Sequence, residues 1–265
     1  MPVPSLPKPP EGGHSISRVV VALVAVVVAA AILLGSSPVD AAARKVKLGV
    51  SMTEGSRDIA VMDEIKAETG RYPAIWTVWS AWGNANTKKF PSDMVKKIKA
   101  RGAVPLVFWE PVQKFGVCTD HARFKKIKNG KFDWYIKSWA KAAKASKTKI
   151  LLRFAHEVNG RYFPWTVGSC GNTVADYKAA WKRVYNLVRN KVGARNVQFV
   201  WTVAKKSCPG GCNPYKRFYP GNQYVQWVGF SNFNWGAHSG NWAPMAKGIK
   251  PVMGKFKQFT KKQVI

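Results

Sequence analysis

Short apolar runs, rich in β-branched and aromatic residues, alternate along the chain with longer stretches whose apolar residues recur at helical spacing. The short runs predict strands near 46–52, 74–79, 104–109, 149–155, 197–203 and 224–230, with a stub at 251–253. The longer stretches predict helices near 57–69, 91–101, 132–147 and 174–191. Strands that alternate in this way with amphipathic helices indicate a parallel sheet covered by helices.

Seven such strands favour a (β/α)8 barrel of the TIM type over a doubly wound sheet, although periodicity alone does not separate the two. After Met253 the chain is a short stretch rich in Lys and Gln, too short for an eighth strand and helix. We therefore expect an incomplete α/β barrel, with the seventh strand a stub and the eighth missing, as after a truncation or a change of reading frame.

The N-terminal segment has the pattern of an export signal. An unbroken aliphatic run from Val19 to Leu34 is followed by Ala41-Ala42-Ala43, a small-residue cleavage motif. The run is shorter than the roughly 20 residues that usually span a bilayer. We expect residues 1–43 to be a signal peptide, residues 44–265 the domain, and the protein to be secreted. An uncleaved membrane anchor at residues 19–34 is the alternative.

The chain carries 43 Lys and Arg against 13 Asp and Glu, for a net charge of +30. Such a charge favours an anionic partner, yet the lysines form no recognisable nucleic-acid-binding motif. We expect attraction to an anionic cell-wall polymer and no nucleic-acid partner, while solvated helix faces explain much of the charge equally well. We also expect a monomer.

Four cysteines agree with an oxidising compartment. Cys208 and Cys212 flank a Pro-Gly-Gly turn, which leaves Cys118 to pair with Cys170. A zinc site at Cys208 and Cys212 is a weaker alternative, because His238 is the only nearby histidine. No metal and no cofactor is expected.

The most polar strand end follows residues 149–155, where His156 and Glu157 come directly after an apolar run. Because side chains alternate along a strand, Arg153 and Glu157 are expected on one face, where the guanidinium can orient or stabilise the carboxylate. Parallel barrels build their sites at the carboxyl ends of their strands. A lone Glu at a strand end is usually only a solvated loop residue, but the neighbouring Asn159 and Trp165 favour a sugar-binding site.

The segment R-F-A-H-E-V-N-G, with F-P-W shortly after it, resembles the acid/base segment of glycoside hydrolase family 26, the β-mannanase family. Supporting stretches are E-T-G-R-Y-P, V-F-W-E-P, Y-P-G-N-Q-Y-V-Q-W-V-G-F and K-P-V-M. The resemblance implies a TIM barrel that cleaves β-linked polysaccharide, most simply endo-β-1,4-mannan, with retention. It implies that Glu157 is the general acid/base and that Arg153 and His156 are active-site residues.

Other aromatic and polar residues fall at or near the ends of predicted strands. The expected substrate contacts among them are Trp165, Trp109, Glu110, Trp201, Asn234 and Trp235. A single Trp in a barrel is more often part of the core than a platform for a ligand. Twelve tryptophans, many of them near strand ends, nevertheless favour a sugar-stacking cleft.

A retaining glycosidase needs a second carboxylate about 5 to 5.5 Å from the first. The resemblance places it just after K-P-V-M, where this chain has Gly254 and Lys255, and no Asp or Glu follows Asp176. The family's Tyr on strand six corresponds to Phe233. Two functions therefore stay open: a secreted glycosidase acting on mannan or a related β-glucan or xylan, and an inactive polysaccharide-binding relative or fragment. Pairing of Glu110 with Glu157 is a further alternative.

Overall fold

The computed structural model describes residues 47–51, 59–86, 88–205, 215–233, 236 and 242–265. The predicted signal peptide, Cys208, Cys212, Asn234 and Trp235 lie outside the described residues. Residues 47–265 form one unit, and the domain boundary at 43/44 stays a prediction. Within the described ranges, no helix is long and apolar enough to cross a membrane.

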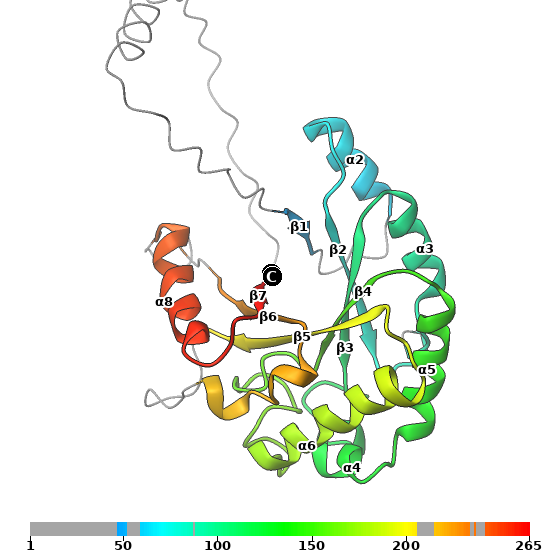
Figure 1. Cartoon of the computed structure of the whole chain (residues 1–265), viewed down its shortest axis with the longest axis vertical. Helices are drawn as coiled ribbons and strands as arrows, with labels where there is room; N and C mark the ends of the chain where they lie inside the picture. The colour runs from blue at the N-terminus through cyan, green and yellow to red at the C-terminus, as the bar shows by residue number, and fades with distance from the viewer. Residues whose placement is uncertain (1–46, 52–58, 87, 206–214, 234–235, 237–241) are drawn as a thin grey trace, which may run out of the picture. The chain divides into compact units, whose positions relative to one another are not determined.

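Seven parallel strands form one sheet in which spatial order follows chain order (Figure 1). The strands are β1 (Gly49–Val50), β2 (Ile75–Ala81), β3 (Val104–Glu110), β4 (Ile150–Phe154), β5 (Val197–Ala204), β6 (Trp227–Ser231) and β7 (Gln263–Val264). A doubly wound sheet would reverse its order partway, so that alternative is wrong. Among the described strands β1 and β7 are not hydrogen-bonded to each other. The sheet is therefore a curled, open part of a (β/α)8 barrel, which confirms the predicted fold class.

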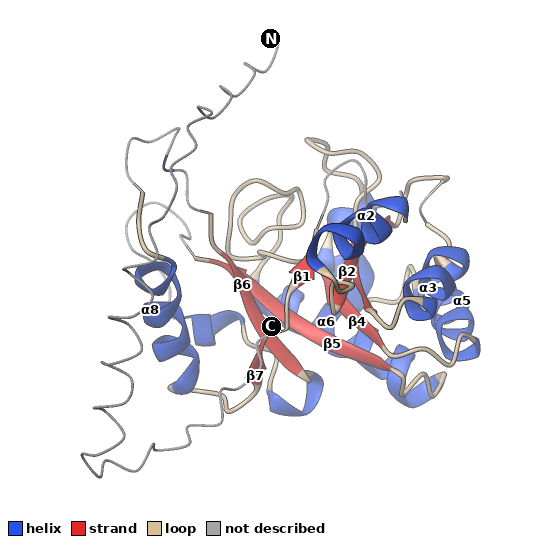
Figure 2. Cartoon of the chain, turned by 90° about the horizontal axis from the view of Figure 1, so that it is seen from above, coloured by secondary structure: helices blue, strands red, loops and turns tan. Residues whose placement is uncertain are grey.

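Helices lie around the outside of the strands, with α2, α3 and α5 on one side and α8 on the other (Figure 2). The α-helices are α2 (Ala60–Thr69), α3 (Ser92–Ala100), α4 (Phe124–Lys128), α5 (Asp133–Ala145), α6 (Val174–Tyr185) and α8 (Met245–Lys257). The shorter elements are the 3-10 turns η2 (Asp120–Ala122), η4 (Tyr215–Phe218) and η5 (Asn222–Tyr224), and a π-helical segment, η3 (Asn186–Lys191), that continues α6.

Two helix ends follow the sequence signals. The Thr173 hydroxyl accepts a hydrogen bond from the Asp176 backbone N–H at 3.1 Å and caps α6. Gly70 ends α2 with φ +76°, a left-handed conformation that glycine adopts at little cost. These two local signals mark the start of α6 and the end of α2.

The predicted strand stub at 251–253 is wrong, because these residues lie inside α8. Gly248, Val252 and Phe256 are the buried residues of α8, and their spacing of four puts them on one helical face. Phe256 packs against Trp201, with ring centroids 5.8 Å apart. The short apolar run P-V-M is therefore one stripe of a helix rather than a strand.

The seventh strand is instead β7, which lies in the Lys- and Gln-rich stretch near residue 265 where no strand was expected. Gln263 pairs with Trp227 and Val264 with Val228 of β6. The family resemblance placed the second carboxylate at Gly254 or Lys255. That placement is wrong, because both residues belong to α8, a helix outside the sheet.

Candidate active site

The segment after β4 has a backbone conformation unusual for its residue types. Ala155 has φ +44° and Glu157 has φ +53°, although neither is glycine. A left-handed conformation costs an L-residue roughly 1 to 2 kcal/mol. Ala155 N–H donates to the Trp109 carbonyl at 3.1 Å and Glu157 N–H to the Thr202 carbonyl at 3.3 Å. The two neighbouring strands thus hold the turn in place, as is common where strain is stored at a functional site.

Arg153 is the buried charge at the centre of the site. Its Nε donates to Thr202 Oγ1 at 2.9 Å and its Nη2 donates to Ser231 Oγ at 2.8 Å. The guanidinium also lies 4.2 Å from the centroid of the Phe108 ring. Burial lowers the pKa of Arg153 to about 10, so it remains charged at neutral pH. It therefore presents a fixed positive charge that is held by two neighbouring strands.

Glu157 lies beside that charge. Its Oε1 is 3.6 Å from Arg153 Nη2, and its side chain is 13% exposed. The two side chains lie together as expected, but Glu157 follows the end of β4, so the turn after the strand and not alternation along it brings the carboxylate to Arg153.

His156 stands between Glu157 and a second carboxyl group, that of Glu110 at the end of β3. Its Nε2 is 3.1 Å from Glu110 Oε1, and its Nδ1 is 4.0 Å from Glu157 Oε1. Burial raises the pKa of Glu110 to about 8, although Arg153 acts in the opposite direction. Burial and then the charge of Arg153 hold the pKa of His156 well below its usual value.

These pKa shifts favour a protonated Glu110 beside a neutral His156 at neutral pH. In that state the Glu110 hydroxyl donates to Nε2, and Nδ1, 4.0 Å from Glu157 Oε1, has no hydrogen-bond partner among the described residues. Glu110 is 4% exposed and bonded to the histidine, so it cannot reach a substrate as the partner carboxylate of Glu157. Glu110 and Glu157 lie near different nitrogens of His156, and the burial of Glu110 disfavours the alternative of a catalytic Glu110–Glu157 pair.

Asn159 and Trp165 fix the loop that follows. The Asn159 amide donates to the Ala204 carbonyl at 2.9 Å, and the Ala204 N–H donates back to Asn159 Oδ1 at 2.8 Å. Trp165 Nε1 donates to the His156 carbonyl at 2.9 Å, and the ring stacks on Phe163 with centroids 4.6 Å apart. Trp165 has no exposed surface, so it supports the loop and offers no ring face to a sugar.

Trp109 and Trp201 are also core residues, and their predicted contact with substrate is wrong. Both are fully buried. Trp109 Nε1 donates to Tyr135 of α5 at 3.1 Å, and Trp201 packs on Tyr219 with centroids 5.0 Å apart. Since side chains alternate on a strand, Trp109 and Trp201 point toward the helices while their neighbours Glu110 and Thr202 face the site.

Several residues at the site were missed by sequence reasoning. Thr202 and Ser231 are the hydrogen-bond partners of Arg153. Their place in the sequence could have revealed them, because each is a small polar residue near the carboxyl end of an apolar strand. Trp79 of β2, one of the tryptophans expected near the strand ends, has its ring centroid 6.2 Å from that of His156 and keeps partial exposure, unlike Trp109 and Trp201. Phe115 is 54% exposed and lies 6.4 Å from Phe163.

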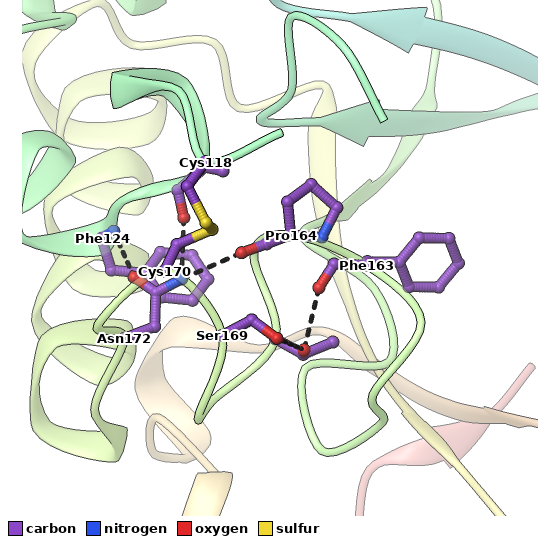
Figure 3. Close-up of a disulfide and its surroundings, with 9 residues drawn as sticks. Cys118, Phe124, Phe163, Pro164, Ser169, Cys170 and Asn172 are labelled. Atoms are coloured by element: carbon purple, nitrogen blue, oxygen red, sulfur yellow. Dashed lines mark hydrogen bonds between the residues drawn. A yellow bond between two sulfur atoms is a disulfide. The ribbon is translucent and has the colours of Figure 1, made fainter. Parts of the chain in front are cut away.

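A disulfide closes the loops over this edge of the sheet. Cys118 follows β3, Cys170 follows β4, and their Cα atoms are 5.2 Å apart (Figure 3). The predicted pairing of Cys118 with Cys170 is thus confirmed. Asn172 reinforces the closure, since its Oδ1 accepts from Phe124 N–H at 2.8 Å and its Nδ2 donates to Ala122 and Pro164 carbonyls. The loop that carries the aromatic residues is therefore tied to the adjacent loop.

Comparison with known proteins identifies related sequences. The profile of Glycosyl hydrolase family 26 matches residues 117–254, just over half of the chain. Endoglucanase H of Acetivibrio thermocellus is 36% identical over 137 residues, covering 51% of this chain and 14% of that protein. Beta-1,3-xylanase TXYA of a Vibrio species is 30% identical over 109 residues, covering 41% of this chain and 22% of that protein. The chain spans less than a quarter of the length of either relative.

Solved structures share the fold. Bacillus subtilis mannanase man26 matches with a TM-score of 0.58 and 19% identity, covering 82% of this chain and 70% of that chain. The catalytic domain of an endo-beta-1,4-mannanase from Bacillus sp. JAMB-750 matches with a TM-score of 0.62 and 20% identity, covering 80% and 63%. At such identities the likeness concerns the fold alone.

Proposed function

Because this chain belongs to glycosyl hydrolase family 26, we propose that its domain cleaves a β-linked polysaccharide with retention and that Glu157 is the general acid/base. The observation that carries the proposal is the cluster at the end of β4, where Glu157 lies between the Arg153 guanidinium and the imidazole of His156. In the protonated form Glu157 donates to the leaving glycosidic oxygen, and the carboxylate then activates water. Arg153 and His156 position the Glu157 carboxylate, and the positive charge of Arg153 stabilises its negative charge.

The substrate that we propose is β-1,4-mannan. Support comes from the shared fold with mannanases and from the resemblance of the Glu157 segment to β-mannanases. The related sequences carry the names of an endoglucanase and a β-1,3-xylanase, so β-glucan and xylan are the competing substrates. Trp79 and Phe115, the partly exposed rings near the site, are the proposed stacking surfaces for the sugar.

The second carboxylate belongs, on this proposal, to a continuation of β7. The register pairs Trp227 with Gln263 and Val228 with Val264, so the position level with Ser231 is the second after Ile265. Ser231 accepts a hydrogen bond from Arg153, which itself contacts Glu157. A carboxylate near that position would face the space beside Glu157, whereas residues 254–255 lie in α8.

A second candidate function rests on the sequence. No Asp or Glu follows Asp176, so the 265 residues alone supply no nucleophile on β5, β6 or β7. A retaining enzyme without its nucleophile loses the covalent step while sugar binding survives. The 265-residue chain by itself is therefore expected to bind glycan and to hydrolyse it very slowly or not at all.

We propose that the protein is secreted as a monomer after cleavage near Ala43. The Cys118–Cys170 disulfide agrees with an oxidising compartment. N-terminal sequencing of exported protein would test the cleavage site. Recovery in membranes only, with residues 19–34 intact, would favour the anchor.

Reducing-sugar release on mannan, β-glucan and xylan would test the activity. Three proteins are compared: this chain, a chain in which β7 continues and carries a Glu near the second position after Ile265, and that longer chain with Glu157→Ala. The longer chain should be active on mannan, and both others should be inactive. Robust hydrolysis by the 265-residue chain would overturn the argument about the second carboxylate.

A further inference from the structure

A large hollow in the described surface lies between α5 and the helical segment formed by α6 and η3, away from the end of β4. It measures 1410 Å³ and is lined by seven lysines and one arginine against a single aspartate, Asp133. That aspartate is already engaged, because Arg183 Nε and Nη2 donate to its two oxygens at 2.7 and 2.6 Å. The hollow, called the α5–α6 groove below, therefore presents an excess of positive charge.

The lysines of the α5–α6 groove stand on both of its walls. Lys137, Lys141 and Lys144 follow one another at spacings of four and three along α5, so they share one helical face. Lys182 and Lys191 come from the opposite wall. Within the described residues, Lys137, Lys141 and Lys191 are exposed and form no ion pair with a carboxylate. Like charges at these spacings repel one another, and a bound polyanion would relieve that repulsion.

Two contacts hold the walls in place. Arg183 of α6 forms its two-point bond to Asp133 at the start of α5. Lys144 near the end of α5 donates to the Val192 carbonyl after η3 at 2.9 Å. The walls are thus fixed toward both ends of α5, so little ordering cost is paid when a ligand enters.

The chemistry of the lining selects among polyanions. Among the described residues no aromatic side chain lines the groove, so stacking of unpaired nucleic-acid bases has no platform there. The arginine that lines it is occupied by Asp133, so the free charges of the groove are lysine ammonium groups, which act as point charges. What remains is a row of ammonium groups over an apolar floor that includes Ala179 and Leu187. Rows of point charges over an apolar surface suit a chain of sugars that each bear a carboxylate.

We propose that the α5–α6 groove binds a linear anionic polysaccharide with repeated carboxylates, independently of the site at Glu157. The row from Lys137 to Lys144 rises about 10 Å along the helix axis, so it engages several successive charged groups. Such binding would hold the domain on an acidic matrix while the end of β4 acts on a neutral β-glycan.

Binding of polygalacturonate to the full chain tests this proposal, measured by calorimetry at an ionic strength of about 0.1 M, where the Debye length is about 10 Å. The test variant carries Lys137→Gln, Lys141→Gln and Lys191→Gln. The matched control carries Lys89→Gln, Lys96→Gln and Lys99→Gln, three exposed lysines near α3 that lie outside the groove. Both variants lose the same net charge, and melting curves show whether both are folded.

The dissociation constant should rise about tenfold or more in the groove variant and less than about twofold in the control. Excess neutral mannan should not compete, and Glu157→Ala should leave polygalacturonate binding unchanged, whatever the outcome of the activity assays. Equal weakening of both variants would overturn the groove and leave only general charge attraction. Tighter binding of a DNA oligonucleotide that displaces polygalacturonate would overturn the choice of ligand.

Discussion

Replacing Glu110 by glutamine should make the protein more stable, and increasingly so as the pH rises. Glu110 is buried beside His156, and burial raises its pKa from 4.5 to about 8. The folded protein therefore keeps a proton that the unfolded chain releases above pH 4.5. Stability is lost as the pH rises from about 4.5 to about 8 and then levels off. A glutamine side chain has no proton to lose, and its amide can donate the same hydrogen bond to Nε2.

The magnitude follows from the size of the shift. At 1.36 kcal/mol per pKa unit, the ionisation of Glu110 costs about 3 kcal/mol at pH 7 and about 5 kcal/mol above pH 8. At pH 4.5 the cost is close to zero, so the two proteins should then have similar stability apart from the small difference between an amide and a carboxylic acid. His156 titrates in both proteins, and its contribution largely cancels in the difference.

Urea unfolding at several pH values between 4.5 and 8.5, followed by tryptophan fluorescence with the disulfide intact, measures this difference. The free energy of unfolding of Glu110→Gln minus that of the parent should grow by several kcal/mol across this range, at unchanged m-value. A difference that stays constant with pH would show that Glu110 titrates normally. A difference that shrinks as the pH rises would indicate an ionised Glu110 stabilised by protonated His156, and would contradict the neutral pair.

Three further predictions concern the frame of the site. Arg153→Ala should destabilise the fold by about 3 kcal/mol in urea unfolding, because it leaves buried partners without their donor, and a loss below about 1 kcal/mol would contradict the role of Arg153 as the central buried charge. Joint Cys118→Ser and Cys170→Ser should cost about 4 kcal/mol from the loop entropy of a separation of 52 residues, and an unchanged melting temperature would refute this. Trp79→Ala should weaken mannan binding with little loss of stability, whereas Trp109→Phe should lower stability and leave binding unchanged. The reverse result would restore Trp109 as a sugar contact.

The barrel could be predicted because its central strands, β2 to β5, are largely buried and its helices carry clear apolar stripes. Continuous apolar runs and helical stripes differ in period, so strands and helices can be told apart in the sequence. Their alternation along the chain then predicts that each strand lies parallel to the next one in the sequence. The exceptions were β7, which is only two residues long and exposed, and the run at 251–253, which is too short for periodicity to separate a strand from a helix. Only its extension to Gly248 and Phe256, at a spacing of four, reveals the helical face.

The site was predictable in its charges and less so in its aromatic residues. Arg153, His156 and Glu157 follow from their place at the end of one apolar strand and from the resemblance to a known family. Trp109 and Trp201 sit next to site-facing residues in sequence, but a shift of one position along a strand turns a side chain to the other face. A position near a strand end was therefore insufficient to predict a sugar contact. The strand register pairs Arg153 with Phe108 and Phe154 with Trp109, so Trp109 lies on the face opposite Arg153.

The assignment of Glu157 as the general acid is tested by the leaving-group dependence of Glu157→Ala, in the chain in which β7 continues and carries the second carboxylate. An acid catalyst matters for a basic leaving group such as the sugar oxygen of mannan and hardly at all for a nitrophenolate. Glu157→Ala should lower kcat/KM on mannan by about 10² to 10⁴, while the release of nitrophenol from an aryl β-mannoside, measured in its first turnover, should fall far less. Equal losses on both substrates would contradict the assignment of Glu157 as the general acid.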